Sequence, residues 1–207
     1  MLCRGTLTRV EIVKEYDIAP IAHVKLLAGQ EKKSCTNDKL EHRYYCFSYK
    51  HKKDKNKSGT FICGKHAANH FLKLLNHKEI PLFNPLSSER VSHGGGSGRG
   101  DETRDTREWN PIAKELSNAI NFLIISWNTP PKDVLSDIKK RLETAPMQKP
   151  RLNDVKAVNT IISHDKKKRK LSDMIEELRK DNPSLKEYSF GRLNQILANE
   201  DKPSHFS

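Results

Sequence analysis

The chain has 207 residues, of which 35% are hydrophobic, 31% are charged and 7% are aromatic. The aromatic content excludes wholesale disorder, and no apolar run approaches the ~20 residues that a membrane-spanning helix needs. The formal net charge is +12, and residues 1–88 hold 16 Lys or Arg against 8 Asp or Glu. We therefore expect an intracellular protein that is cytoplasmic, or nuclear if the organism is a eukaryote. We expect it to contact nucleic acid (DNA or RNA) rather than a membrane.

The first part of the chain favours β-structure followed by a helix. Alternating or aromatic-rich segments predict strands at 6–13, 23–28, 42–49 and 60–63. The last two of these strands form a hairpin, and its turn at 50–59 is rich in lysine. From residue 64 to residue 76 the apolar residues fall on one helical face, which predicts a helix.

A glycine- and serine-rich segment, 87–108, predicts a flexible linker between two domains. The fold class expected from this division is α+β. A small, basic, β-rich domain built on a β-hairpin, expected to bind zinc through its cysteines and histidines, would occupy 1–86. A bundle of about five short helices, which need each other for stability, would occupy 109–207.

The helices of the second domain are predicted from caps and from apolar periodicity. Asn110 followed by Pro111 predicts a helix start, because asparagine caps helices and proline suits the first helical position. An apolar stripe then continues to Trp127. Three further patterns lie at 134–142, 155–162 and 172–180. The last helix is predicted to begin at Ser184, where the residues have the form of a capping box.

The four cysteines are Cys3, Cys35, Cys46 and Cys63, and in an intracellular chain they indicate metal ligands or buried thiols rather than disulfides. Cys63 and His66 flank a predicted turn at the start of a helix, a spacing at which a thiolate and an imidazole can share one ion. This arrangement resembles the second half of a treble-clef zinc site, although ten residues separate Cys35 from Cys46. The predicted zinc (Zn) ligands are Cys35, Cys46, Cys63 and His66, with His70 as an alternative ligand. Simple burial of Cys46 and Cys63 remains the alternative.

A catalytic alternative uses the same segment. The order strand, loop, strand and helix resembles the His-Asn-His nucleases, in which a strand histidine activates water and the helix holds a metal. That resemblance implies that His42 is the base and that His66 or His70 is a ligand. The chain has no phosphate-binding glycine loop, nucleophile elbow or paired-carboxylate motif, so an enzyme is not the leading expectation.

Two basic segments are candidate contacts for nucleic acid. The turn at 50–57 carries lysines beside tyrosines that can stack on unpaired bases, and 166–170 reads KKKRK. The last two helices are interpreted as a helix-turn-helix in which Arg192 reads bases. The predicted nucleic-acid-binding residues are Lys50, Lys52, Lys53, Lys55, Lys57, Lys167, Lys168, Arg169 and Arg192.

These observations predict a nucleic-acid-binding protein with a structural zinc site, acting as a regulatory or accessory factor. Two alternatives remain open: a metal-dependent nuclease, and an adaptor whose helical domain binds a protein partner.

Overall fold

The computed structural model describes residues 1–87 and 107–207, so the predicted linker, 87–108, lies outside the described residues except at its ends. Strands β1 to β5 are Tyr16–Lys25, Lys32–Lys33, Lys39–Leu40, Arg43–His51 and Ser58–Cys63. Helices α1 to α7 are Thr6–Glu15, Lys65–Leu74, Pro111–Ser126, Asp133–Thr144, Leu152–Ser163, Leu171–Asp181 and Gly191–Ala198. The fold is α+β, and none of the helices in the described residues is long and apolar enough to cross a membrane.

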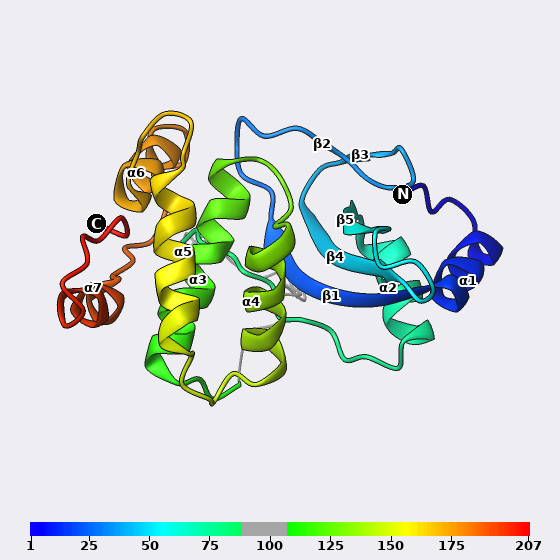
Figure 1. Ribbon diagram of the computed structural model, residues 1–207. Coiled ribbons are helices and arrows are strands. Elements are labelled where there is room, and N and C mark those ends of the chain that lie inside the picture. The colour runs from blue at the N-terminus through cyan, green and yellow to red at the C-terminus, as the bar shows by residue number, and fades with distance from the viewer. Residues whose placement is uncertain (88–106) are drawn as a thin grey trace.

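Strand β4 is the centre of the molecule. It pairs antiparallel with β1 on one side and with β5 on the other. Because side chains alternate along a strand, Tyr44 and Cys46 face one side of the sheet, and Tyr45 and Phe47 face the other. Helices α3 and α4 lie against the first side with α5 to α7 beyond them, and α1 and α2 cover the second side (Figure 1).

The larger hydrophobic core lies between the sheet and the C-terminal helices. Tyr44 and Cys46 are fully buried there, in one cluster with apolar residues of β1 and of helices α3 to α7. Residues 1–86 and 109–207 were predicted as separate domains, but they share this core. Both segments contribute side chains to the larger core, whereas the smaller core is formed by residues of 1–86 alone.

A smaller aromatic core lies on the opposite side of the sheet. The ring of Phe47 stacks on that of Phe61 with centroids 5.4 Å apart, and both rings contact Phe71 of α2. Ile12 of α1 completes this side. The two cores make β4 a strand that is buried on both faces.

Several predicted elements are confirmed. The hairpin of 42–49 and 60–63 corresponds to β4 and β5, and the helix at 64–76 corresponds to α2. Pro111 is the first residue of α3, and the side chain of Asn110 accepts hydrogen bonds from the backbone nitrogens of Ile112 and Ala113. The caps were informative because they satisfy backbone donors that a helix leaves unpaired.

The strand predicted at 6–13 is wrong, because these residues form helix α1. Over so short a segment, alternation of apolar and polar residues does not separate a strand from a helix. The helix is selected by its packing: Arg9 and Ile12, three residues apart, are the buried positions on the side that faces α2.

The predicted start of the last helix at Ser184 is also wrong, because α7 begins at Gly191. The residues around Ser184 pair with the chain at 85–87 instead. Ser87 donates its backbone N–H to the carbonyl of Ser184, and Lys186 donates to the carbonyl of Pro85. These long-range hydrogen bonds take the place of the local helical ones that a capping box would support.

A disulfide joins Cys3 to Cys35, with the Cα atoms 5.4 Å apart. The backbone N–H of Cys3 also donates to the carbonyl of Cys35. This pairing corrects the expectation that the cysteines would be ligands or thiols only. The sequence did not indicate it, since the two residues are 32 positions apart and meet only through tertiary folding.

The cysteine pairing can be tested by counting reactive thiols. Cys46 and Cys63 are fully buried, and burial raises the pKa of Cys46 to about 12. In native protein at pH 8, neither thiol should therefore react with a thiol-specific reagent. Protein unfolded in urea should show two thiols without a reductant and four after reduction. Cys3→Ser should lower the free energy of unfolding by roughly 3–4 kcal/mol. Four reactive thiols in unreduced, unfolded protein would contradict the disulfide.

A buried ion pair lies within α4, between Lys139 and Glu143, and a hydrogen bond to Ser117 connects it to α3. The ammonium of Lys139, which is 1% exposed, donates to Ser117 Oγ and to Glu143 Oε1, both at 2.6 Å. Burial alone would raise the pKa of Glu143, but the charges of Lys139 and Arg107 hold it below its ordinary value. The carboxylate is therefore ionised at neutral pH and depends on Lys139 for compensation.

Removing the lysine should expose that dependence. Lys139→Ala should cost about 3–5 kcal/mol of unfolding free energy at pH 7, because it leaves a buried carboxylate incompletely paired. A depressed pKa in the folded state gives stability that is present above the unfolded value of 4.5 and is lost as the pH falls below it. In urea titrations, the difference between wild type and variant should thus shrink in acid. Lys140→Ala, on the exposed side of α4, is the control.

Candidate nucleic-acid interface

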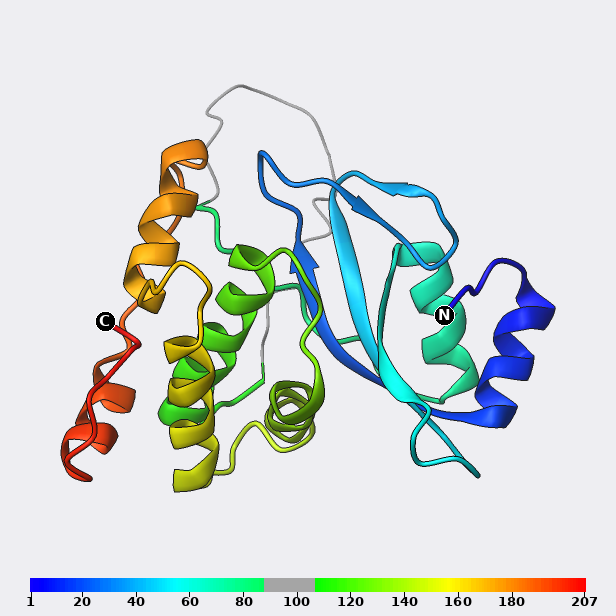
Figure 2. The same cartoon turned by 45° about the horizontal axis from the view of Figure 1, so that its top comes forward.

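The connection between β4 and β5, here called the hairpin tip (residues 50–57), projects beside the C-terminal end of α1 (Figure 2). The backbone N–H of Lys52 donates to the carbonyl of Glu15 at 3.0 Å, and its ammonium donates to the carbonyl of Val13 at 2.9 Å. Carbonyls at the end of a helix lack helical partners and carry partial negative charge. Lys52 therefore attaches the tip to α1.

The hairpin tip is ordered by its own side chains. Nδ1 of His51 accepts the backbone N–H groups of Lys53 and Asp54 at 3.1 and 2.9 Å. The carboxylate of Asp54 accepts the backbone N–H of Asn56 at 3.0 Å. Turn residues of these types commonly satisfy local backbone donors in this way. The lysines consequently project from a defined backbone.

Five lysines are exposed on the hairpin tip, and they differ in what compensates them. Lys52 is held at the end of α1, and Lys57 lies 3.6 Å from the carboxylate of Asp54. Within the described residues, the side chains of the other three lysines form no hydrogen bond or ion pair: Lys50, Lys53 and Lys55. These three ammonium groups are available to an anionic partner.

A group of aromatic rings lies at the base of the hairpin tip. Tyr16 meets Tyr49 edge to face at 5.6 Å and His51 at 4.9 Å. Tyr49 lies over Gly59, where a Cβ atom would come within 2.8 Å of the tyrosine hydroxyl. Both tyrosines are half-buried, so part of each ring remains accessible. Such rings beside cations can stack on unpaired bases.

The stacking residues differ in part from those expected. Tyr44 and Tyr45 lie next to the basic turn in the sequence, but they are 0% and 1% exposed and belong to the two cores. Tyr16 was missed because the strand predicted at 23–28 overlaps only the end of β1, which begins at Tyr16. Its pairing with His51 across β1 and β4 brings it to the tip. A prediction that started this strand at Tyr16 would have placed the tyrosine opposite His51.

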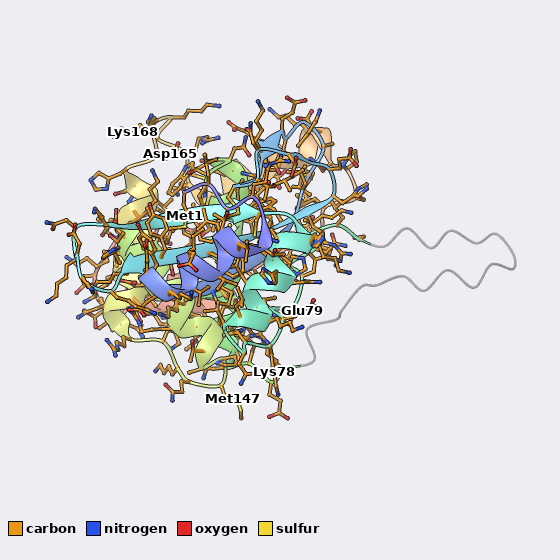
Figure 3. All side chains as sticks on the ribbon, turned by 90° about the vertical axis from the view of Figure 1, so that its right-hand side faces the viewer. Met1, Lys78, Glu79, Met147, Asp165 and Lys168 are labelled. Carbon is orange, nitrogen blue, oxygen red and sulfur yellow. A yellow bond between two sulfur atoms is a disulfide. The ribbon has the colours of Figure 1, made fainter. Side chains whose placement is uncertain are left out.

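The basic segment 166–170 is partly neutralised by acidic neighbours. Arg169 donates to both carboxylate oxygens of Asp165 at 3.0 and 2.9 Å and also pairs with Glu177. Lys167 lies 3.8 Å from Glu177. Lys168 is exposed at the edge of the molecule, near Asp165 (Figure 3). Arg169, at 14% side-chain exposure, is held inside the protein, and Lys168 is the freer cation.

Arg192 lies at the start of α7, where Glu115 binds it. The guanidinium donates to Glu115 Oε1 at 2.7 Å, and the backbone N–H of Arg192 donates to Oε2 at 3.0 Å. The predicted helix-turn-helix needs a short turn between its helices. Here residues 182–190 separate α6 from α7, and the two helices lie at opposite ends of the helical layer (Figure 1). This arrangement differs from the one that base reading by Arg192 assumes.

The predicted zinc ligands are not brought together. Cys35 is bonded to Cys3. Cys63 pairs with Tyr45 across the sheet, and its side chain therefore joins the aromatic core, whereas Cys46 lies in the larger core on the opposite face. Across residues 1–87 and 107–207, no three Cys, His, Asp or Glu side chains gather closely enough to hold a metal ion. The residues present do not fit one tetrahedral zinc ion.

The histidines of the nuclease hypothesis have other surroundings. Nδ1 of His70 accepts a hydrogen bond from Arg9 at 2.9 Å, and burial and the charge of Arg9 lower the pKa of His70. His66 is exposed at the start of α2, and His42 is exposed just before β4. A metal at His70 Nδ1 would have to displace Arg9. The nuclease therefore stays a prediction without a described metal cluster to support it.

The zinc prediction is decided by elemental analysis. Because the thiols of Cys46 and Cys63 lie on opposite faces of the sheet, we expect well under one zinc per chain, both in oxidised protein and in protein purified with a reductant. One zinc per chain that disappears in Cys63→Ser would instead establish the predicted site. His77→Ala is the control, because His77 is exposed and is not among the predicted ligands.

Two of three comparisons with known proteins are negative. Searches among curated proteins and among solved structures found no match. Residues 3–206 match the family described as "Uncharacterised conserved protein UCP028583". This match extends over the disulfide, the sheet and all the C-terminal helices. The chain therefore belongs to that family.

Proposed function

We propose that this protein binds nucleic acid through the hairpin tip. The observation that carries the proposal is the group of three exposed lysines without a partner in the described residues, Lys50, Lys53 and Lys55. They lie on a tip that His51 and Asp54 keep ordered. In protein–nucleic acid complexes, lysines commonly contact phosphate oxygens, and these contacts do not require a particular base sequence.

The charge around the tip supports the same proposal. Residues 1–88 carry eight more basic than acidic residues. Several of the acidic side chains in this part are already paired with cations: Glu11 with Lys14, Glu31 with Lys39, and Asp38 with Arg4. The excess positive charge is therefore not offset locally, and it would attract a polyanion over a distance of about 8–10 Å at physiological salt.

The accessible parts of Tyr16 and Tyr49 suggest how a strand would be held. Lysines would contact the phosphates, and one ring would stack on an unpaired base. Such a mode favours single-stranded nucleic acid with little sequence preference. It suits a regulatory or accessory factor, and it requires no metal.

Charge removal at the tip tests the proposal. The triple variant Lys50→Gln, Lys53→Gln, Lys55→Gln should bind single-stranded oligonucleotides more weakly. Each phosphate contact that is lost means that fewer counterions are released when the protein binds. The slope of log affinity against log salt should fall by up to about one unit per lost contact. Fluorescence anisotropy over a salt titration measures both quantities.

A charge-matched variant controls for net charge. Lys140→Gln, Lys180→Gln, Lys202→Gln removes the same number of exposed lysines from the helical half. It should leave affinity and slope nearly unchanged. If the two triple variants lose affinity equally, the tip has no special role. If neither loses affinity, the protein does not bind nucleic acid through these lysines.

A further inference from the structure

A second surface of a different kind lies at one end of the helical layer, where α3 and α5 end and α4 begins (Figure 1). Two adjoining cavities of about 420 and 580 Å³ share Trp127, Thr129 and Ile161. We call this surface the Trp127 groove. Its remaining apolar walls are formed by Ile124, Pro130, Pro131, Val134 and Leu135.

Trp127 is fixed in the groove by a buried charge. Its indole N–H donates to Asp165 Oδ1 at 2.7 Å. Hydrogen bonds from Arg169 and then from Trp127 hold the pKa of Asp165 well below its ordinary value, so the acceptor stays ionised. A ring held in this way loses little conformational entropy when a partner covers it. Trp127 is thus pre-organised for contact.

The groove leaves apolar surface and one polar atom without partners. Val134 is 53% exposed, and Trp127 and Ile161 are half-buried. The hydroxyl oxygen of Ser126, which lines the groove, is buried and has no hydrogen-bond partner among the described residues. Partly exposed tryptophan in an apolar hollow is the kind of residue on which binding energy concentrates. A bulky apolar side chain of a partner would fill this space.

The rim of the groove is positive. Lys132, His164, Lys166 and Lys167 are exposed around it. The acidic residues of the groove are Asp133, which is exposed, and Asp165, whose charge is compensated by Arg169. Lys132 and Lys166 form no ion pair within the described residues. Charge complementarity therefore favours an acidic partner.

We propose that the Trp127 groove binds a short acidic peptide segment of another protein. One bulky apolar side chain would enter the hollow, and flanking Asp or Glu residues would meet the lysines of the rim. A second copy of this chain is a poor occupant, because both copies carry a net charge of +12. The chain's own residues 88–106 contain no apolar side chain larger than valine. Nucleic acid is disfavoured because the walls of the groove around Trp127 are largely aliphatic and suit an apolar side chain better than a stacked base.

The chain offers a direct spectroscopic probe of this surface. It has two tryptophans, Trp109 and Trp127, so Trp109→Phe leaves Trp127 as the sole indole. The probes are synthetic peptides without tryptophan, in which one apolar anchor lies between pairs of aspartates. The anchor is Phe, Leu or Met. We expect a saturable blue shift of Trp127 emission, because the anchor replaces water at the ring. A peptide with alanine as the anchor should bind at least about tenfold more weakly.

Charge reversal on the rim tests the electrostatic half of the proposal. Lys166→Glu, Lys167→Glu should weaken peptide binding at least about tenfold, whereas Lys180→Glu, Lys202→Glu should change it less than about twofold. Both pairs are exposed, and circular dichroism checks that the two variants keep the fold of the wild type. This surface is separate from the hairpin tip, so loss of either binding activity leaves the other measurable.

Three results would overturn the proposal. The first is the absence of any shift of Trp127 emission across the peptide series. The second is a shift produced by a single-stranded oligonucleotide and not by the peptides, which would assign the groove to nucleic acid. The third is an emission shift that follows protein concentration without peptide, which would assign the groove to self-association.

Discussion

Burial of β4 on both faces is the constraint on which the rest of the structure depends. Alternate side chains of this strand are fully buried on opposite sides: Tyr44 and Cys46 on one, Tyr45 and Phe47 on the other. A strand of this kind is stable only if each face has an apolar cover. Helices α1 and α2 supply one cover and the C-terminal helices supply the other. The sheet therefore shares one core with each of the two helical groups.

The same alternation determines the chemistry of the cysteines. Cys46 and Cys63 lie on neighbouring strands, but Cys63 pairs with Tyr45 rather than with Cys46. A register difference of one residue places two side chains on opposite faces of a sheet. The two thiols consequently enter different cores, where burial raises the pKa of each above its ordinary value. Cys46 and Cys63 lie on neighbouring strands, but this proximity does not bring their thiols together at one metal site.

Ion pairing divides the cations of this basic protein into two classes. Arg169 and Arg192 are bound by Asp165 and Glu115, and they position elements of the helical layer. The lysines of the hairpin tip have fewer acidic neighbours and remain exposed. Surface cations without such neighbours are the ones that can contribute to binding a polyanion. The Trp127 groove adds an apolar surface whose geometry depends on the Asp165–Arg169 pair.

Local features of the sequence determined the elements whose energetics are local. The cap at Asn110, the hairpin around 50–59 and the exposed lysines of its turn could all be recognised because neighbouring residues suffice to form them. Tertiary structure alone decided the Cys3–Cys35 disulfide, the helical state of 6–13 and the pairing of Ser184 with Ser87. In these cases the stabilising partner lies far along the chain. Periodicity and composition report a residue's own preference and do not report which distant group it meets.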